Sequence, residues 1–240
     1  MRRLLTAGIP SNMIQAVILA GGLGTRMRPR TETVPKPLLP VLGRPFLEYQ
    51  IELLRGQGIT RFLVLAGHLG ELIQEHFGDG STRGVSVSYS FEPPGLLGTG
   101  GALKNAEGVL DEDFLLLNGD TLLEIDYAAL TRSFRSSGKW ALLTAARRSG
   151  SAPGNLLVDA SGKVLDYSKR HPRGEHVDAG VAAFSRRILD LIPPARACSL
   201  EEEVYPRLIE RGEVTALRLD TTFFDMGTPA GLAALEAHLA

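Results

Sequence analysis

The sequence contains one cysteine, Cys198, among its 240 residues. A single cysteine excludes a disulfide within the chain and suits a reducing compartment, so we expect a cytoplasmic protein. No apolar run approaches the roughly 20 residues of a membrane-spanning helix, and we expect no membrane partner. The formal net charge of −1 provides no field that would attract nucleic acid. The five histidines lack the spacing of a zinc site, and no hexapeptide or other internal repeat occurs.

The first dozen residues are read separately from the rest of the chain. They hold Arg2 and Arg3 and a weakly apolar stretch, whereas a signal peptide needs a longer apolar core and a small-residue cleavage site. Met13 precedes the first strand directly. We therefore expect residues 1–12 to be a loosely ordered extension and residues 13–240 to form a single domain.

Apolar runs alternate with segments of helical periodicity through the first half of the chain. Strands are predicted at 16–20, 62–66, 85–91 and 114–117, with helices between them. This order predicts an α/β, Rossmann-like fold with a mostly parallel central sheet and helices on both faces. After residue 147 the sequence becomes polar and rich in turns, and residues 159–162 predict a hairpin. A small β-rich lobe is expected there.

A glycine-rich turn, residues 21–25, ends the first apolar run and is followed by Arg26 and Arg28. Glycine lets a ligand approach the backbone, and successive N–H groups form a concavity that binds anions. Guanidinium groups add donors for phosphate oxygens. Lys36 stands between two prolines, which stiffen its loop. These features predict a phosphate-binding loop with cations converging on a polyphosphate.

Two other glycine motifs fit this turn less well. A dinucleotide-binding motif, Gly-x-Gly-x-x-Gly, would require glycine at Met27 and an acidic residue about 20 residues further on. A P-loop would require Gly-Lys-Ser or Gly-Lys-Thr. A plain tight turn would explain one or two glycines but not the nearby cations.

Two further segments suggest ligand contacts at the ends of strands. Gly100 and Gly101 would let a base or ribose lie against the backbone, and Thr99 is predicted to cap the helix that follows, although a structural role explains these glycines equally well. Asp120 follows a buried strand, where ligands bind in open α/β sheets, and its carboxylate could hold Mg²⁺ or cap a turn. Asp126 and Ser199 are predicted as helix caps.

The residues from Leu19 to Pro29, followed by Pro35-Lys36-Pro37, resemble the signature of the sugar-1-phosphate nucleotidyltransferases. The resemblance extends from about Met13 to the end of the chain. It implies a Mg²⁺-dependent enzyme, a monomer or homodimer, that condenses a nucleoside triphosphate with a sugar 1-phosphate and so supplies NDP-sugars for cell-surface polysaccharides. It also implies a nucleotide half, residues 13–146, and a sugar-phosphate half, residues 147–240.

The resemblance implies a role for each matching residue. Arg26 and Lys36 are implied as catalytic residues, and Asp120 and Asp225 as metal ligands. The implied nucleotide-binding residues are Leu19, Ala20, Gly21, Gly22, Gly24, Thr25, Gly100, Gly101 and Asn118. The implied sugar-phosphate-binding residues are Asn155, Lys169, Asp178 and Gly180. The family often has an acid before the lysine that matches Lys169, and serine stands there, so an exposed basic turn is the alternative.

The sugar and the base are left open by the sequence. The pattern looks closest to D-glycero-D-manno-heptose 1-phosphate guanylyltransferases, and uridylyl- or thymidylyltransferases acting on hexose 1-phosphates are nearly as similar. A non-catalytic sensor of nucleotide or sugar phosphate is a second hypothesis. A transferase acting on choline phosphate is a third, but Tyr167 and Trp140 do not clearly form the cage that its cation requires.

Overall fold

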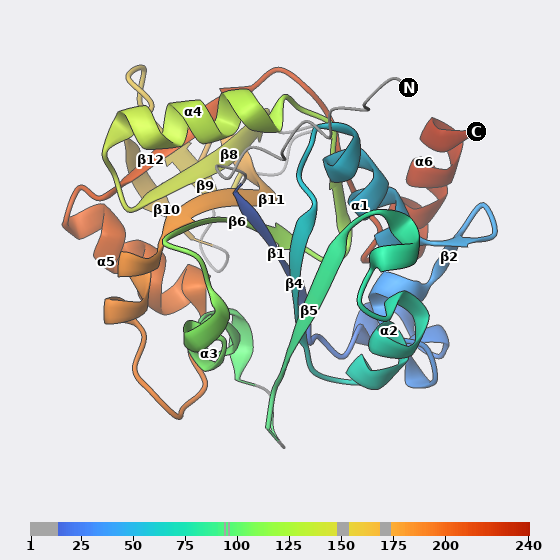
Figure 1. The fold of residues 1–240 in the computed structure, drawn as a ribbon. Coiled ribbons are helices and arrows are strands. Elements are labelled where there is room, and N and C mark those ends of the chain that lie inside the picture. The colour runs from blue at the N-terminus through green and yellow to red at the C-terminus, as the bar shows by residue number, and fades with distance from the viewer. Residues whose placement is uncertain (1–13, 94, 96, 148–153, 169–173) are drawn as a thin grey trace, which may run out of the picture.

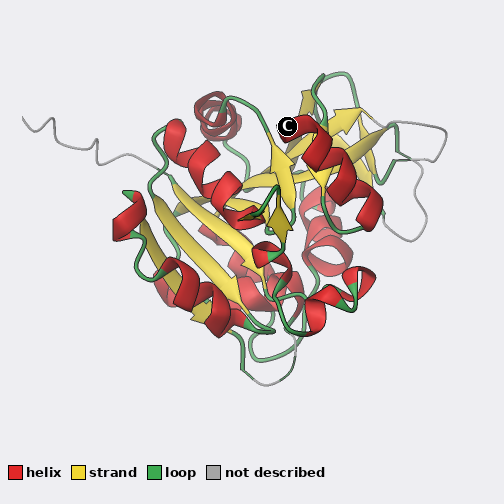
Figure 2. Cartoon of the chain, turned by 90° about the vertical axis from the view of Figure 1, so that its right-hand side faces the viewer, coloured by secondary structure: helices red, strands yellow, loops and turns green. Residues whose placement is uncertain are grey.

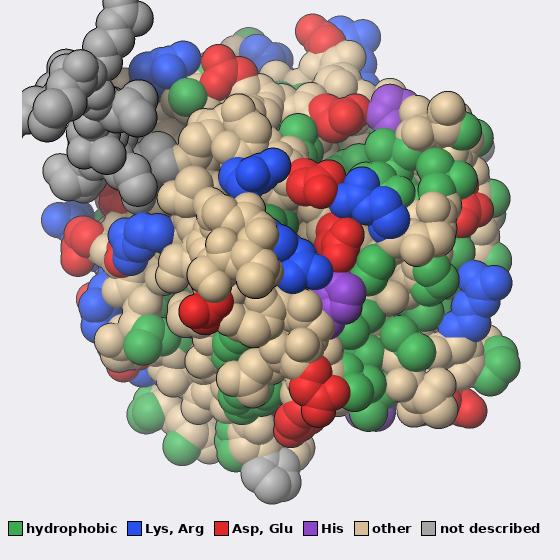
Figure 3. Space-filling view, turned by 45° about the vertical axis from the view of Figure 1, so that its right-hand side comes forward, with side chains coloured by type: hydrophobic (Ala, Val, Ile, Leu, Met, Phe, Trp, Pro, Cys, Tyr) green, Lys and Arg blue, Asp and Glu red, His purple; other side chains and the backbone are tan. Residues whose placement is uncertain are grey.

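The computed structural model describes residues 14–93, 95, 97–147, 154–168 and 174–240. The predicted extension, residues 1–12, and the predicted phosphate ligand Lys169 lie outside these residues. No helix among the described residues is both long and apolar enough to cross a membrane. Acidic and basic side chains are interspersed on the face drawn in Figure 3.

A nine-stranded sheet forms the centre of the molecule (Figure 1). Its strands are β1 (Gln15–Ala20), β4 (Arg61–Ala66), β5 (Ser86–Phe91), β6 (Asp113–Asn118), β8 (Ala141–Arg147), β9 (Leu156–Val158), β10 (Val164–Tyr167), β11 (His176–Ser185) and β12 (Val214–Leu219). β1 pairs in parallel with β4 and β6, and β5 pairs in parallel with β4 at one edge. β11 runs antiparallel to β6 and β8. The Rossmann-like α/β expectation is therefore confirmed.

Two small sheets accompany the large one. They are β2 (Pro40–Val41) with β3 (Arg44–Pro45), and β7 (Thr121–Leu123) with β13 (Phe223–Asp225). The predicted hairpin is present as the antiparallel pair β9 and β10. That hairpin joins the same large sheet through β11, so strands from both halves of the chain share one sheet.

The helices cover both faces of the large sheet (Figures 1 and 2). They are α1 (Phe46–Gly56), α2 (Gly70–Phe77), α3 (Gly98–Asn105), α4 (Tyr127–Ser137), α5 (Tyr205–Glu210) and α6 (Pro229–Leu239). Shorter helical turns are Thr25–Met27, Arg30–Glu32, Lys36–Leu38, Ser81–Arg83, Glu107–Val109 and Arg186–Leu191, and a π-helical turn, Leu200–Val204, precedes α5.

The core consists of one apolar layer on each face of the sheet. Alternate residues of a strand point to opposite faces, so Val17 packs with α3 and α5 while Ile18 packs with α1, α2 and α4. Both side chains are fully buried, and burying an aliphatic side chain of this size contributes about 1.5–3 kcal/mol. A smaller apolar cluster joins α6 to the region of Met27.

The two predicted helix caps are confirmed. Asp126 accepts a hydrogen bond from the Ala129 N–H at 2.8 Å, and Ser199 accepts one from the Glu202 N–H at 3.1 Å. At the Ser199 cap, the side chain that bonds back to the Ser199 N–H belongs to Glu203 rather than to Glu202. The Ser199 N–H donates to Glu203 Oε1 at 3.1 Å.

Candidate functional site

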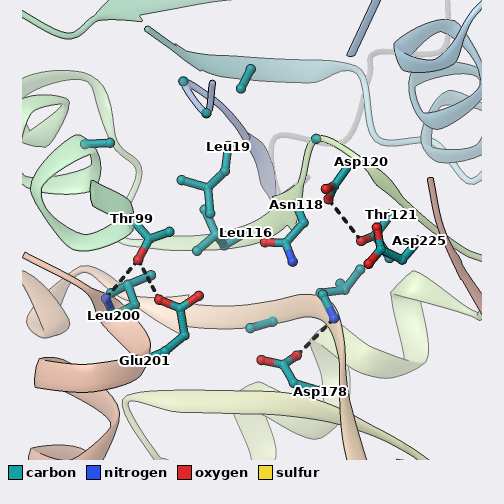
Figure 4. Close-up of a pocket in the computed structure, with 18 of the residues that line it drawn as sticks. Leu19, Thr99, Leu116, Asn118, Asp120, Thr121, Asp178, Leu200, Glu201 and Asp225 are labelled. Atoms are coloured by element: carbon teal, nitrogen blue, oxygen red, sulfur yellow. Dashed lines mark hydrogen bonds between the residues drawn. The ribbon is translucent and has the colours of Figure 1, made fainter. Parts of the chain in front are cut away.

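A pocket of about 600 Å³ opens at the carboxyl ends of β1 and β6, beside β11 (Figure 4). Most residues predicted as ligands lie in its wall: Leu19, Ala20, Gly21, Gly22, Arg26, Lys36, Asn118, Asp120, Asn155, Asp178, Gly180 and Asp225. The close-up shows Asp120, Thr121 and Asp225 together at one side, and Thr99 and Glu201 at the other. The pocket is therefore polar and charged at several points of its wall.

The glycine-rich turn after β1 is shaped by close contacts of its backbone. A Cβ atom at Gly21 would collide with the Glu92 carboxylate in its present position, so the glycine leaves room for that side chain. Gly24 adopts φ +60°, which favours glycine, and its carbonyl accepts a hydrogen bond from the Thr31 hydroxyl at 2.9 Å. Gly24 and Thr25 are not among the described wall residues. Their contact with a nucleotide stays a prediction.

Lys36 and Asp120 form a salt bridge inside the pocket. Lys36 Nζ lies 2.7 Å from Asp120 Oδ2, and the two side chains are only 15% and 20% exposed. Asp120 follows Gly119, whose N–H donates to the Leu19 carbonyl at 2.9 Å. A Cβ at Gly119 would collide with that same carbonyl. The turn that carries Asp120 is thereby fixed against the end of β1.

Asp225 is brought beside Asp120 by the pairing of β13 with β7. Asp225 is the cross-strand partner of Thr121, and the Met226 N–H donates to the Asp120 carbonyl at 2.9 Å. Asp225 Oδ1 accepts the Gly227 N–H at 2.7 Å. A Cβ at Gly227 would lie 2.7 Å from the Arg26 guanidinium, so Arg26 lies against this turn.

The two carboxylates suit a hard cation that is shared with a ligand. Asp120, in the turn before β7, and Asp225, at the end of β13, both offer carboxylate oxygens. No group of three or more His, Cys, Asp or Glu side chains suited to a metal occurs among the described residues. Mg²⁺ typically takes one or two protein carboxylates and completes its shell with water and phosphate oxygens. The donor set therefore fits Mg²⁺ bound together with a phosphate.

The start of α3 differs from the prediction. The helix begins at Gly98, and the cap predicted for Thr99 is wrong. The Thr99 hydroxyl instead donates to Glu201 Oε2 at 2.8 Å and accepts from the Leu200 N–H at 2.9 Å. Because these partners lie about 100 residues further along the chain, Thr99 links α3 to the turn before α5.

Gly100 and Gly101 face the chain around Cys198. Their N–H groups donate to the Cys198 carbonyl at 2.9 and 3.2 Å. A Cβ at either position would lie about 3 Å from backbone oxygens of Cys198 or Arg196. Neither glycine is a described wall residue, so close packing explains both, and nucleotide contact stays a prediction for them.

A network of polar side chains joins β9, β10 and β11 at the far end of the pocket. The Tyr167 hydroxyl donates to Asp178 Oδ2 at 3.0 Å, and the Asp178 N–H donates to Asn155 Oδ1 at 2.9 Å. Burial, together with the charge of Asp178, raises the pKa of Tyr167, so this hydroxyl remains a donor. The Tyr167 ring packs edge-on against Tyr205, with centroids 4.9 Å apart.

The bulge in β11 brings Gly180 to the pocket. Gly180 adopts φ +73°, and its N–H donates to Asp178 Oδ1 at 2.9 Å. A Cβ there would lie 2.9 Å from both Asn118 Nδ2 and Thr121 Oγ1. Glycine thus lets the strand approach the end of β6.

Sequence reasoning missed several residues of the pocket wall. They are Glu92, Tyr167, Glu201, Tyr205 and Phe223, among others. Glu201 follows the predicted cap Ser199 and would suit a helix start, and Tyr167 does not clearly form a cation cage, so neither pattern indicates a pocket residue. Glu92 belongs to no motif that can be recognised in a single sequence. Its position directly after the edge strand β5 is a weak indication that it lies near the pocket.

The chain is similar to known proteins over most of its length. A model of the nucleotidyl transferase family matches residues 15–240. The chain is 32% identical over 233 residues to UTP–glucose-1-phosphate uridylyltransferase of Synechocystis sp., covering 89% of this chain and 60% of that protein. It is 34% identical over 225 residues to mannose-1-phosphate guanylyltransferase of Mycobacterium tuberculosis, covering 91% and 62%. The chain thus spans less than two thirds of the length of these relatives.

Solved structures match over nearly the whole chain. The crystal structure of HddC from Yersinia pseudotuberculosis has a TM-score of 0.82 and 28% identity, covering 95% of this chain and 100% of that one. The same protein complexed with GMP-PN gives a TM-score of 0.82 and 27% identity.

Proposed function

The chain belongs to the nucleotidyl transferase family, and from this we propose that it is a sugar-1-phosphate nucleotidyltransferase. It condenses a nucleoside triphosphate with a sugar 1-phosphate and releases pyrophosphate. The observation that carries the proposal is the convergence of Lys36, Arg26, Asp120 and Asp225 at the end of β1, within one pocket that also holds the Asn155–Tyr167–Asp178 network. A pocket of about 600 Å³ is of the size that encloses small organic ligands.

The reaction is an in-line displacement at phosphorus. An oxygen of the sugar phosphate attacks the α-phosphorus of the nucleoside triphosphate. The bond between that phosphorus and the oxygen bridging the α- and β-phosphates breaks, and pyrophosphate leaves. Two anions must approach each other, so the protein must neutralise charge and align the groups. The attacking phosphate is already ionised, and the mechanism therefore needs no protein nucleophile.

Each charged residue has a part in this scheme. The backbone N–H groups of residues 21–25 and Arg26 bind the β- and γ-phosphates and stabilise the leaving pyrophosphate. Lys36 reaches toward the α-phosphate from its position beside Asp120. Asp120 and Asp225 would hold Mg²⁺, which when bound supplies positive charge at the α-phosphate. Lys169 is proposed to bind the sugar phosphate, as the family resemblance implies.

The far end of the pocket supports a polyhydroxylated acceptor. Asp178, Asn155 and Glu201 present oxygen atoms in the wall, and such oxygens accept hydrogen bonds from sugar hydroxyl groups. Tyr167 holds Asp178 in place at 3.0 Å. We propose a heptose 1-phosphate as the sugar, on the resemblance described above, with a hexose 1-phosphate as the alternative.

The position of Glu92 favours guanine as the base. Glu92 lies in the pocket wall against Gly21, with Oε2 accepting the Leu97 N–H at 2.6 Å. Guanine presents N1–H and N2–H₂ side by side, a pair of donors that one carboxylate can accept. Uracil and thymine present a single N3–H between two carbonyl oxygens, which a carboxylate would repel. We therefore propose GTP as the nucleotide, with UTP or dTTP as the alternative.

The competing hypothesis is a sensor that binds the same ligands without catalysis. The presence of both cations and both carboxylates in the pocket wall speaks for the enzyme, because a sensor would have no need of all four. As an enzyme of this class the protein would use Mg²⁺ and act in the cytoplasm as a monomer or homodimer.

The test is a pyrophosphate-release screen. Four nucleoside triphosphates are combined with heptose, mannose and glucose 1-phosphates in the presence of Mg²⁺. We expect release that requires both substrates and is fastest with GTP. If no pair of substrates gives pyrophosphate release, while calorimetry still detects GTP binding, the sensor hypothesis would be favoured.

A further inference from the structure

Gln50 is a fully buried polar side chain on the apolar face of α1. It is 1% exposed and lies between Leu47, Ile51 and Leu54, which pack into the core. A buried amide costs free energy unless its polar atoms are hydrogen-bonded. A leucine at this point of the helix would complete the apolar stripe, so the amide needs an explanation beyond core packing.

The amide of Gln50 closes the turn that carries Asp120. Gln50 Nε2 donates to the Asn118 carbonyl at 2.8 Å and to the Thr121 carbonyl at 2.6 Å. These carbonyls flank Gly119 and Asp120, so one NH₂ group holds both ends of the turn. The Met226 N–H holds the turn from the other side, through its 2.9 Å bond to the Asp120 carbonyl.

The orientation of this amide is determined by its two acceptors. Both amide hydrogens are used, and Gln50 Oε1 is buried with no hydrogen-bond partner among the residues that the structure describes. The reverse orientation would set Oε1 against two carbonyl oxygens. A buried acceptor without a partner is costly, and its presence here indicates that the side chain is retained for its two donors.

We propose that Gln50 is a positioning residue for the reaction: it fixes the Asn118–Thr121 turn so that the Asp120 carboxylate faces Lys36 and the metal position beside Asp225. The inference rests on the proposed function. Gln50 is not among the described wall residues, and it acts through the backbone of the turn. A misplaced ligand weakens metal binding, because Mg²⁺ demands near-ideal geometry of its ligands.

The chain offers a matched control in Gln15. It is 4% exposed, and its amide donates to the Val109 carbonyl at 3.1 Å and accepts from the Asp111 N–H at 3.0 Å. Gln15 begins β1, at the end of the strand opposite the pocket. Gln15→Leu therefore removes two partly buried hydrogen bonds of a buried amide without touching the Asp120 turn.

The experiment compares Gln50→Leu and Gln15→Leu with the unaltered chain. Mn²⁺ affinity is measured by electron paramagnetic resonance in the presence of GTP, well below the Tm of each variant. We expect both variants to lose a similar amount of Tm. Only Gln50→Leu should weaken Mn²⁺ binding, by tenfold or more, raise the Mg²⁺ concentration for half-maximal turnover and lower kcat more than it raises KM for the sugar phosphate.

Gln50→Asn provides a second variant in case Gln50→Leu does not fold. Its shorter amide reaches only one carbonyl, and we expect a smaller loss of Mn²⁺ affinity. Mn²⁺ affinity within twofold of the unaltered chain in a folded Gln50 variant would overturn the proposal while leaving the enzyme assignment intact. Failure of both variants to fold would also overturn it, because Gln50 would then serve the whole fold. If the unaltered chain binds no Mn²⁺ with GTP, the proposed function and this inference fail together.

Discussion

Lys36 and Asp120, 84 residues apart in the chain, meet with 2.7 Å between Nζ and Oδ2. Their side chains are largely shielded from water, so this pair interacts more strongly than an exposed ion pair. The contact places a cation and a proposed metal ligand at one point of the pocket. It also means that Asp120 is already paired before any substrate arrives.

Replacing Lys36 or Arg26 by alanine is expected to lower turnover by about 100- to 1,000-fold, the usual cost of losing one donor to a developing anion. Both variants should retain a melting temperature close to that of the unaltered chain. Arg30→Ala is the matched control, because Arg30 is exposed and lies outside the described pocket wall. Steady-state kinetics measure the turnover of each variant, and circular dichroism measures its melting temperature. Near-normal turnover in both variants would contradict the assigned roles.

Asp120→Asn and Asp225→Asn should each abolish Mg²⁺-dependent turnover and weaken GTP binding only when Mg²⁺ is present. The amide keeps the shape of the side chain but removes the charge that a hard cation requires. Asp126→Asn is the control, because asparagine also caps helices well. Calorimetry with and without Mg²⁺ measures the effect, and turnover that persists in EDTA would refute the metal assignment.

Local signals in the sequence were sufficient to predict the elements that carry the pocket. The apolar runs that form β1 and β6 are buried on both faces. Such runs can be recognised in the sequence without knowing which strands pair with them. The glycine turn could be predicted from the same run, because its glycines directly follow the strand in the sequence. These features could be predicted because their causes lie close together in the chain.

Contacts between distant segments could not be predicted in this way. The pairing of Thr121 with Asp225 and the bond from Thr99 to Glu201 each join residues about 100 positions apart. Their register depends on how whole elements pack, which residue spacing does not encode. Thr99 is an example. Its hydroxyl is suited to cap the adjacent helix, but in the structure it donates to the distant Glu201 carboxylate instead.

Glu92→Gln is expected to change the preference between bases. Glutamine offers an amide in place of a two-oxygen acceptor, so the ratio of kcat/KM for GTP to that for UTP should fall by roughly tenfold or more. Competition assays with both nucleotides measure the ratio directly. Glu75→Gln, an exposed position on α2, serves as control. An unchanged ratio would remove Glu92 from base recognition.

Glu48 predicts a pH dependence of stability away from the pocket. Burial pushes the pKa of Glu48 upward, but hydrogen bonds from His76, Arg83 and Arg44 outweigh it, and the pKa lies below its usual value. A carboxylate with a lowered folded-state pKa stabilises the fold above its unfolded pKa of about 4.3, and this contribution is lost as the pH falls through the folded value.

Glu48→Gln should therefore lower the Tm at pH 7, and the difference from the unaltered chain should shrink as the pH falls below about 4. Loss of hydrogen bonds to a charged group costs roughly 1.5–3 kcal/mol. Thermal melts between pH 3.5 and pH 7 measure the difference. A constant difference across this range would show that the Glu48 charge is not its source.

Exchange of pyrophosphate into triphosphate tests the central claim most directly. Because the displacement exchanges one phosphoanhydride for another, the protein should form labelled GTP from labelled pyrophosphate and GDP-heptose when Mg²⁺ is present. It should form none from GTP and labelled pyrophosphate without a sugar phosphate, since no protein nucleophile takes part. Absence of label with every NDP-sugar, while binding is still measurable by calorimetry, would contradict the enzyme and favour the sensor. Label with GTP and no sugar phosphate would indicate a nucleotidylated protein and contradict the direct mechanism.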